Sequence, residues 1–173
     1  SSLSFSPFYD TMKKMIAIVA GGDSSEHDVS LRSAAGIMSF MDSRKYDVYI
    51  VEIKGNIWIA HYGKEDCPID HNDFTFTAKD GKHAFDFAYI TIHGTPGENG
   101  ILQGYFDLIG IPYSTSDVLV EALTFNKYAL NTFLRSAADK TLKIADAILV
   151  RKGEQRPGDA SIVERLGLPC FVK

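Results

Sequence analysis

Two glycine-led segments hold the residues of this sequence whose types and spacing best suit chemistry. Segment 93–100 reads His-Gly-Thr-Pro-Gly-Glu-Asn-Gly, and its His93 and Glu98 are side chains that can change charge. Segment 21–28 reads Gly-Gly-Asp-Ser-Ser-Glu-His-Asp and places Glu26 just before a predicted helix. Glycines permit positive φ angles and a close approach of the backbone to a ligand. These two segments are therefore the candidate binding loops of the chain.

Each candidate loop lies between a predicted strand and a predicted helix. Residues 15–20 and 87–92 are short apolar runs, as expected of buried strands in a parallel sheet. After the second loop, apolar residues recur at helical spacing, at Leu102, Tyr105, Phe106 and Ile109. A glycine-rich turn from a strand to a helix lies at the carboxyl edge of a parallel sheet, where open α/β folds bind ligands. The pattern predicts an α/β fold with its candidate site at that edge.

Each loop is also compatible with a purely structural role. Segment 93–100 would need glycines for the geometry of a tight turn alone, and its residues leave this alternative open. Segment 21–28 lacks the G-x-G-x-x-G spacing of a dinucleotide-binding turn, so a Rossmann cofactor site is disfavoured. Glu26 either faces a ligand cleft or, with Asp23 and Asp28, only complements the positive end of a helix dipole.

The elements that follow the first loop carry no recognisable site. Ser30 is a good N-cap for a helix whose apolar stripe runs to Met41. Residues 46–53 predict the second strand, and residues 56–60 predict a hairpin arm beside its end. These elements are expected to extend and cover the sheet.

Residues 61–84 are polar and predict an irregular segment. Within it, 72–77 can be interpreted as a short edge strand and 80–81 as a turn. Three histidines here lack the spacing of metal ligands and are expected at the surface: His61, His71 and His83.

The last third of the chain predicts a boundary between two domains. Residues 111–113 predict a short strand, and 114–116 offer caps for a helix that runs from Asp117 to Phe133. Lys127 lies near the boundary between the apolar and the polar face of this helix, where a lysine is usually solvated.

A polar segment at 136–141 then breaks the pattern, which divides the chain into a 1–14 extension, a 15–136 amino-terminal α/β domain and a 137–173 remainder. That remainder predicts a strand at 145–150, a helix at 160–166 and a strand at 169–173. Such a set cannot bury its own faces, so the second domain is expected to be incomplete in this sequence.

The composition narrows the classes of partner. The net charge of −4 and the scattered basic pairs argue against nucleic acid. No apolar run approaches the ~20 residues that cross a bilayer, so no membrane is expected. Two lone cysteines, Cys67 and Cys170, fit a reducing compartment, although one disulfide stays open as an alternative. The cytoplasm is the expected location.

Taken together, the motifs resemble the amino-terminal portion of the D-alanine–D-alanine ligases, members of the ATP-grasp superfamily. The resemblance rests on five motifs in family order, and these cover the chain from residue 15 to its end. The motifs are Gly-Gly-Asp-Ser-Ser-Glu at 21–26 with Val-Ser-Leu at 29–31, His-Gly-Thr-Pro-Gly-Glu-Asn-Gly-Ile-Leu-Gln-Gly at 93–104, Gly-Ile-Pro-Tyr at 110–113, Ala-Leu at 122–123 ahead of Asn-Lys at 126–127, and Leu-Gly-Leu-Pro-Cys-Phe-Val-Lys at 166–173.

This resemblance implies a fold and a reaction. The fold would be a parallel-sheet, Rossmann-like pre-ATP-grasp domain, followed by the start of an incomplete ATP-grasp domain. In the reaction, ATP phosphorylates the carboxylate of one D-alanine, and the amine of a second D-alanine attacks the acyl phosphate. The product, D-alanyl-D-alanine, serves peptidoglycan and cell-wall synthesis. Homodimers built on the amino-terminal domain are also implied, with the apolar helices at 30–41 and 101–134 as candidate surfaces.

The resemblance also assigns roles to residues. Glu26 would hold the ammonium of the first D-alanine, and His93 would lie near its reacting carboxylate, so these two are the candidate catalytic residues. The substrate-binding set adds Val29, Ser30 and Gly94. Two lysines would contact the phosphates of ATP, namely Lys127 and Lys173. Carboxylates suit ammonium groups, and lysines suit phosphates.

Three departures from the family pattern accompany these roles. Asn99 stands where an acidic residue is usual, and Asn126 stands where an aspartate commonly precedes the lysine. Neither matches a direct ligand, so these two changes are expected to tune the site. Third, the ligands of Mg²⁺ or Mn²⁺ would lie beyond residue 173, which leaves no metal ligand in this chain and predicts that the chain alone is inactive.

Alternative functions stay open. A close variant would join D-alanine to D-lactate or D-serine, and this sequence does not separate these options. A truncated, non-catalytic module would supply only the dimer surface. An unrelated doubly wound binding domain is disfavoured by the five ordered motifs.

Overall fold

A computed structural model describes residues 13–137 and 141–172 of the chain. The chain divides into two compact units, residues 1–121 and residues 122–173, and each is described by itself. No helix among the described residues is long and apolar enough to cross a membrane. The predicted extension at 1–14 lies mostly outside the described residues, and the first strand begins at Lys14.

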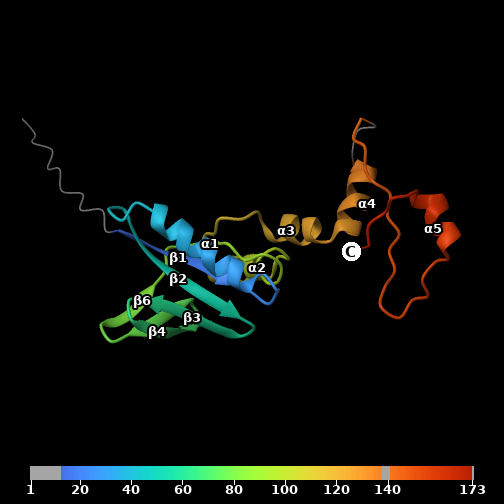
Figure 1. The fold of residues 1–173 in the computed structure, drawn as a ribbon. Coiled ribbons are helices and arrows are strands. Elements are labelled where there is room, and N and C mark those ends of the chain that lie inside the picture. The colour runs from blue at the N-terminus through green and yellow to red at the C-terminus, as the bar shows by residue number, and fades with distance from the viewer. Residues whose placement is uncertain (1–12, 138–140, 173) are drawn as a thin grey trace, which may run out of the picture. The chain divides into compact units, whose positions relative to one another are not determined.

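Unit 1 contains a single seven-stranded sheet (Figure 1), in the order β6-β5-β4-β3-β2-β1-β7. The bounds of its strands are β1 Lys14–Gly21, β2 Tyr46–Lys54, β3 Ile57–Tyr62, β4 Glu65–Asp70, β5 Thr75–Ala78, β6 Gly81–Ala84 and β7 Phe87–Ile90. The strands β2, β1 and β7 are parallel, whereas β2 to β6 form an antiparallel meander. The predicted α/β fold is therefore confirmed, with a mixed sheet.

Strand β1, the middle one of the three parallel strands, is apolar because both of its faces are covered. Its inner residues Ile18 and Val19 are fully buried, and Ile18 pairs with Ile50 on one side and Tyr89 on the other. Ile18 and Ala20 pack against α1 (His27–Phe40), whose buried residue there is Ala34. The alternate residues of β1 belong to the larger core that contains α2 (Ile101–Ile109). A helix thus lies on each face of the parallel part.

The antiparallel part holds a cluster of aromatic side chains. Phe74 and Phe76 are buried, and the ring of Phe74 meets that of Phe106 edge-on at a centroid distance of 4.9 Å. The prediction of an irregular segment at 61–84 was wrong, because β4 and β6 lie there, but the short strand interpreted at 72–77 overlaps β5. Burial alternates along β4, with Cys67 and Ile69 inward, as in a strand with one face on the core.

The short strand predicted at 111–113 is reduced to one isolated parallel bridge, between Ala88 and Tyr113. The single helix predicted from Asp117 to Phe133 is two helices, α3 (Val118–Phe125) and α4 (Lys127–Ala137). Asn126 separates them, because its Oδ1 accepts a hydrogen bond from the backbone N–H of Ala129 at 3.0 Å and caps α4.

In unit 2, the helix predicted at 160–166 is confirmed as α5 (Asp159–Leu166). The strands predicted at 145–150 and 169–173 do not form in the described residues, because an extended segment needs a neighbouring strand to complete its ladder. Three residues of the predicted boundary, 138–140, lie outside the described ranges, and a domain boundary at 136–137 stays a prediction.

Candidate functional site

The two candidate loops meet at one edge of the sheet. β1 ends at Gly21 and β7 ends at Ile90, and these neighbouring strands run parallel. The loop after β1 leads into α1, and the loop after β7 leads into α2. Because parallel neighbours end at the same edge, the predicted position of the candidate site is supported.

Glycine is required where the two loops pack on Ile92. Gly22 has a φ of +94°, and a Cβ added there would lie 2.5 Å from Cγ2 of Ile92. A Cβ added to Gly97 would lie 2.5 Å from the carbonyl oxygen of Ile92. Real Cβ atoms do not come so close to other atoms, so a side chain at Gly22 would push the first loop away from Ile92, and one at Gly97 would distort the second loop itself.

Hydrogen bonds connect the two loops directly. The backbone N–H of Asp23 donates to the carbonyl of Thr95 at 2.9 Å. The hydroxyl of Ser24 donates to the carbonyl of His93 at 2.9 Å and accepts from the backbone N–H of Glu26 at 3.1 Å. The loops that carry Glu26 and His93 are therefore joined at their tips. No role for Ser24 was predicted from sequence, where its only signal is its place between the glycines and the glutamate.

Ser30 joins the same loops at their base. It was predicted as an N-cap, but α1 begins at His27 and Ser30 lies inside its first turns. The side chain is fully buried; its hydroxyl accepts from the N–H of Gly21 at 3.0 Å and donates to the carbonyl of Thr91 at 2.8 Å. Its neighbour Val29 is 43% exposed at the start of the helix.

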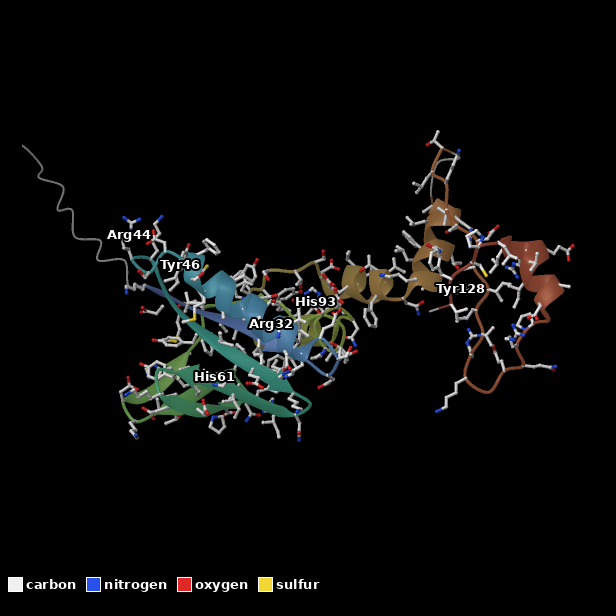
Figure 2. All side chains as sticks on the ribbon, viewed as in Figure 1. Arg32, Arg44, Tyr46, His61, His93 and Tyr128 are labelled. Carbon is white, nitrogen blue, oxygen red and sulfur yellow. The ribbon has the colours of Figure 1, made fainter. Side chains whose placement is uncertain are left out.

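Glu26 and His93 are exposed to solvent at this edge, and Figure 2 shows His93 among the loops near α2. Glu26 occupies the N-cap position of α1, where its carbonyl accepts from the N–H of Ser30 at 2.9 Å. Its carboxylate makes no capping hydrogen bond. The carboxylate is therefore available to a ligand, although its charge also suits the helix dipole.

Two polar side chains shape the second loop. Glu98 accepts a hydrogen bond from the N–H of Gly94 at 2.7 Å, so its carboxylate holds the loop. Gln103 is fully buried, and its Nε2 donates to the carbonyl of Gly97 and to Oγ1 of Thr115, both at 2.8 Å. No role for Gln103 was predicted from sequence, although a polar residue beside the apolar stripe of α2 is a signal for such a role.

A polar network leads from the first loop to the antiparallel part. Oδ1 of Asp23 accepts from the N–H of Gly55 at 2.7 Å. The carboxylate of Glu52 lies 3.4 Å from Nε2 of His27 and 3.0 Å from Nε2 of His61, whose Nδ1 lies 2.7 Å from Asp66. Burial alone would lower the pKa of His61, but the hydrogen bonds with Asp66 and Glu52 outweigh it and raise the pKa.

Two hollows lie in the described part of unit 1. One of about 690 Å³ is lined by Trp58, His71 and residues of α2. Another of about 930 Å³ lies between Lys14 and Tyr113. Neither hollow is lined by Glu26 or His93.

The two candidate phosphate ligands lie outside unit 1. Lys127 is the first residue of α4, and its Nζ donates to the carbonyl of Thr124 at 2.6 Å. It is exposed, as is Asn126 before it. Lys173 lies outside the described residues. Asn99, the other departure from the family pattern, donates from Nδ2 to Oγ1 of Thr95 at 3.0 Å and so supports the second loop.

Comparison with known proteins identifies the family. The family model described as D-ala D-ala ligase N-terminus matches residues 15–116. The D-alanine–D-alanine ligase of Phocaeicola vulgatus is 54% identical over 163 residues, which cover 94% of this chain and 49% of that protein. The chain thus spans about half the length of the curated relatives it matches.

Solved structures agree with this family. A D-alanine–D-alanine ligase from Bacillus anthracis complexed with ATP has a TM-score of 0.63 and 26% identity, and the match covers 86% of this chain and 45% of that one. The VanG D-Ala:D-Ser ligase from Enterococcus faecalis has a TM-score of 0.63 and 28% identity, with 73% and 42% covered. The fold, the joined loops and the family model lead to one conclusion: this chain belongs to the D-alanine–D-alanine ligase amino-terminal family.

Proposed function

We propose that the protein containing this chain is an ATP-dependent ligase that joins two molecules of D-alanine, for peptidoglycan and cell-wall synthesis. The observation that carries this proposal is the pair of joined loops at the sheet edge, which expose Glu26 and His93 in a chain of this family. The names of the curated relatives and the ATP in the Bacillus anthracis structure support it. Since the reaction consumes ATP, we place it in the cytoplasm.

Each residue of the substrate set has a physical role in this proposal. Glu26 accepts the ammonium group of the first D-alanine, because a carboxylate is the natural partner of a cation. His93 lies beside the carboxylate that becomes the acyl phosphate, with Gly94 leaving room for it. Val29 offers an exposed apolar contact, and Ser30 supports the floor of the site through Gly21 and Thr91.

Lys127 and Lys173 are proposed to bind the phosphates of ATP. Phosphoryl transfer depends mainly on positioning and on neutralisation of charge, and lysine supplies a compact positive charge. Lys127 is placed at the N-terminus of α4, an end of the helix that also favours anions. In the described ranges 13–137 and 141–172, no group of three His, Cys, Asp or Glu side chains could hold a metal ion. We therefore assign none of the described residues to the binding of Mg²⁺ or Mn²⁺.

A second candidate function is a ligase that uses D-serine or D-lactate as its second substrate. It is favoured by the match to the Enterococcus faecalis D-Ala:D-Ser ligase, which is as similar in fold as the ATP-bound ligase. The test uses the whole protein, with ATP, D-alanine and each second substrate in turn, and measures phosphate release and the product by mass spectrometry. We expect D-alanyl-D-alanine as the main product. A preference for D-alanyl-D-serine or the D-lactate ester would replace the proposal with the second candidate.

The isolated chain 1–173 tests whether it is only a part of the machinery. We expect it to release no D-alanine-dependent phosphate, because it spans about half the length of its relatives. A non-catalytic dimerisation module would behave in the same way, so the whole protein must be measured in parallel. Turnover by the isolated chain would contradict this expectation.

We also propose that the whole protein is a homodimer. Two helices of unit 1 expose large apolar side chains that a partner copy would cover, with Phe40 91% exposed on α1 and Leu108 84% exposed on α2. Sedimentation at micromolar concentration checks this proposal, and Leu108→Asp is the variant expected to weaken the dimer. A wild-type protein that sediments only as a monomer would contradict it.

A further inference from the structure

The two side chains proposed to contact the first amino acid come from different loops. Glu26 follows β1 and His93 follows β7, so no covalent geometry fixes the distance between them. In an α-amino acid, by contrast, the ammonium and the carboxylate are fixed on the same carbon. Two protein side chains that bind the ammonium and the carboxylate of such a molecule must therefore be held at a fixed distance from each other.

Ser24 supplies a direct link between the two positions. Its hydroxyl accepts a hydrogen bond from the backbone N–H of Glu26 at 3.1 Å and donates one to the carbonyl of His93 at 2.9 Å. A serine hydroxyl has a single proton to donate, and here it is used across the loops. One oxygen atom therefore contacts the backbones of both residues that carry the proposed substrate groups.

Close packing strengthens this link. A Cβ added to Gly94 would lie 3.3 Å from Cβ of Ser24, so the second loop passes directly over this serine. The N–H of Asp23 also donates to the carbonyl of Thr95 at 2.9 Å, which gives the loops a second connection beside the first. The spacing at Ser24 is thus set by contacts on both sides.

Ser30 offers an internal comparison. Its hydroxyl makes the same kind of link, from the N–H of Gly21 to the carbonyl of Thr91, but it is fully buried at the base of the loops. Ser24 is only half-buried and lies at the tips, where the substrate groups are. The base is therefore fixed by one serine and the tip by another.

We infer that Ser24 is a positioning residue for the first amino-acid substrate, because it sets the spacing between Glu26 and His93. This inference rests on the function proposed above. Ser24 acts through the backbones of these two residues, and its loss would leave the ATP-binding groups unchanged.

The test uses the whole protein with Ser24→Ala, Ser24→Thr and Ser25→Ala. Ser24→Ala is expected to raise the KM for the first D-alanine about tenfold, since two hydrogen bonds are lost, and to leave the KM for ATP within about twofold. Ser24→Thr keeps the hydroxyl and is expected to restore most of the affinity. Ser25→Ala changes the exposed neighbouring serine and serves as the matched control.

Amide hydrogen exchange supplies a readout that does not depend on activity. Ser24→Ala is expected to speed exchange of the Glu26 N–H, while the Gly21 N–H, which is bonded to Ser30, keeps its protection. Faster exchange throughout β1 and β7 would show general loosening and would overturn the positioning role.

The outcomes separate this inference from the function on which it rests. A wild-type protein without D-alanine-dependent turnover would overturn the proposed function, and the substrate role of Ser24 with it. An active wild type whose Ser24→Ala variant keeps a normal KM for D-alanine would overturn the role of Ser24 alone. The inference is also refuted by a loss in Ser24→Ala that Ser24→Thr fails to reverse.

Discussion

The parallel and antiparallel parts of the sheet in unit 1 use their loops in different ways. In the parallel part, β1 and β7 both end at one edge, and their loops expose Glu26 and His93 there. In the antiparallel part, β2 to β6 are joined by short turns at alternating ends of the sheet. Loops from parallel neighbours can therefore converge on a ligand, whereas successive hairpin turns point to opposite ends.

The two parts also differ in what they bury. The antiparallel part contributes the ring cluster around Phe74 and Phe76, and the parallel part contributes small and β-branched residues between two helices. Aromatic rings bury much area and stabilise a core strongly. The antiparallel part thus supplies much of the stability of unit 1, and the loops of the parallel part carry the candidate functional side chains. Substitutions in each part should have separable effects on kinetics and on stability.

The largest expected effect comes from Glu26→Gln in the whole protein. This change keeps the shape of the side chain but removes the charge that would pair with the D-alanine ammonium. Loss of one partner of a desolvated ion pair costs about 3–5 kcal/mol, so kcat/KM for D-alanine is expected to fall by roughly 10²–10³. The KM for the first D-alanine should rise, and the affinity for ATP should change little. Steady-state kinetics with each substrate varied measures these changes.

Asp28→Asn is the matched control for Glu26→Gln. Asp28 is acidic, exposed and in the first turn of the same helix, so its removal weakens the interaction with the helix dipole and an exposed contact with Nδ1 of His27 at 3.3 Å. We expect a loss of about 0.3–1 kcal/mol in stability and near-normal kinetics. If Glu26→Gln behaves like Asp28→Asn, then Glu26 serves only the helix, and the site does not lie at the parallel edge.

A large effect on stability is expected from Phe74→Ala. The ring is fully buried and lies against Phe85 and Phe106, so truncation should lower the free energy of unfolding by about 3–5 kcal/mol. Chemical unfolding measures the change, and the control is Ile57→Val on β3, at a side chain that is 62% exposed and lies outside the helices proposed for the dimer, with a change expected within about 0.5 kcal/mol. The KM for D-alanine of the folded Phe74→Ala protein should stay near the wild-type value. A large rise in that KM would remove the functional distinction between the two parts.

The smallest expected effect concerns pH and His61, which Figure 2 shows on the antiparallel part, apart from His93. Its pKa is raised in the folded protein, so its charged form stabilises the fold fully below the unfolded pKa of about 6.5. This contribution is lost as the pH rises through the folded pKa. His61→Gln should therefore lower the melting temperature more at pH 5.5 than at pH 9. Since the side chain is 39% exposed, the effect should stay below about 1 kcal/mol.

Asp66→Asn checks the cause of this pH dependence. Asp66 contacts Nδ1 of His61 at 2.7 Å, so the variant should weaken the pH dependence of stability without abolishing it, because Glu52 remains. An equal loss of melting temperature for His61→Gln at both pH values would mean that the charge of His61 contributes nothing.

Sequence patterns predicted the parallel part of the sheet better than the antiparallel part. Strand β1 and helix α2 carry long apolar signals, and the glycines mark the turns between them, so their place at one edge followed from sequence. Strands β4 and β6 are short and mostly polar, and Pro68 within β4 is a residue type that argues against a paired strand. Such strands form because they pair with the strands before and after them in the meander, and the residue types of one strand alone do not reveal this pairing.

The candidate site shows the same division between local and non-local information. Glu26 and His93 take their proposed roles from the family resemblance, since their residue types alone are also compatible with a helix terminus and a tight turn. Ser24 and Gln103 were missed as structural links, because their partners lie on another loop or depend on burial. Phe74 adopts a φ of +56°, which a bulky residue accepts only when its surroundings impose it, and no local pattern indicates this.

The position of β7 also determines the order in which unit 1 can assemble. Strands β2 to β6 pair only with the strands that precede or follow them in the chain. The second side of β1, in contrast, is covered only when β7 pairs with it, for example where Ile16 pairs with Phe87. On a ribosome, the meander therefore emerges and pairs first, and β7 closes a long loop afterwards. Until that step, β1 is an uncovered apolar edge open to association with another chain. The two candidate loops thus come together only when β7 pairs with β1, in the same step that covers the second side of β1.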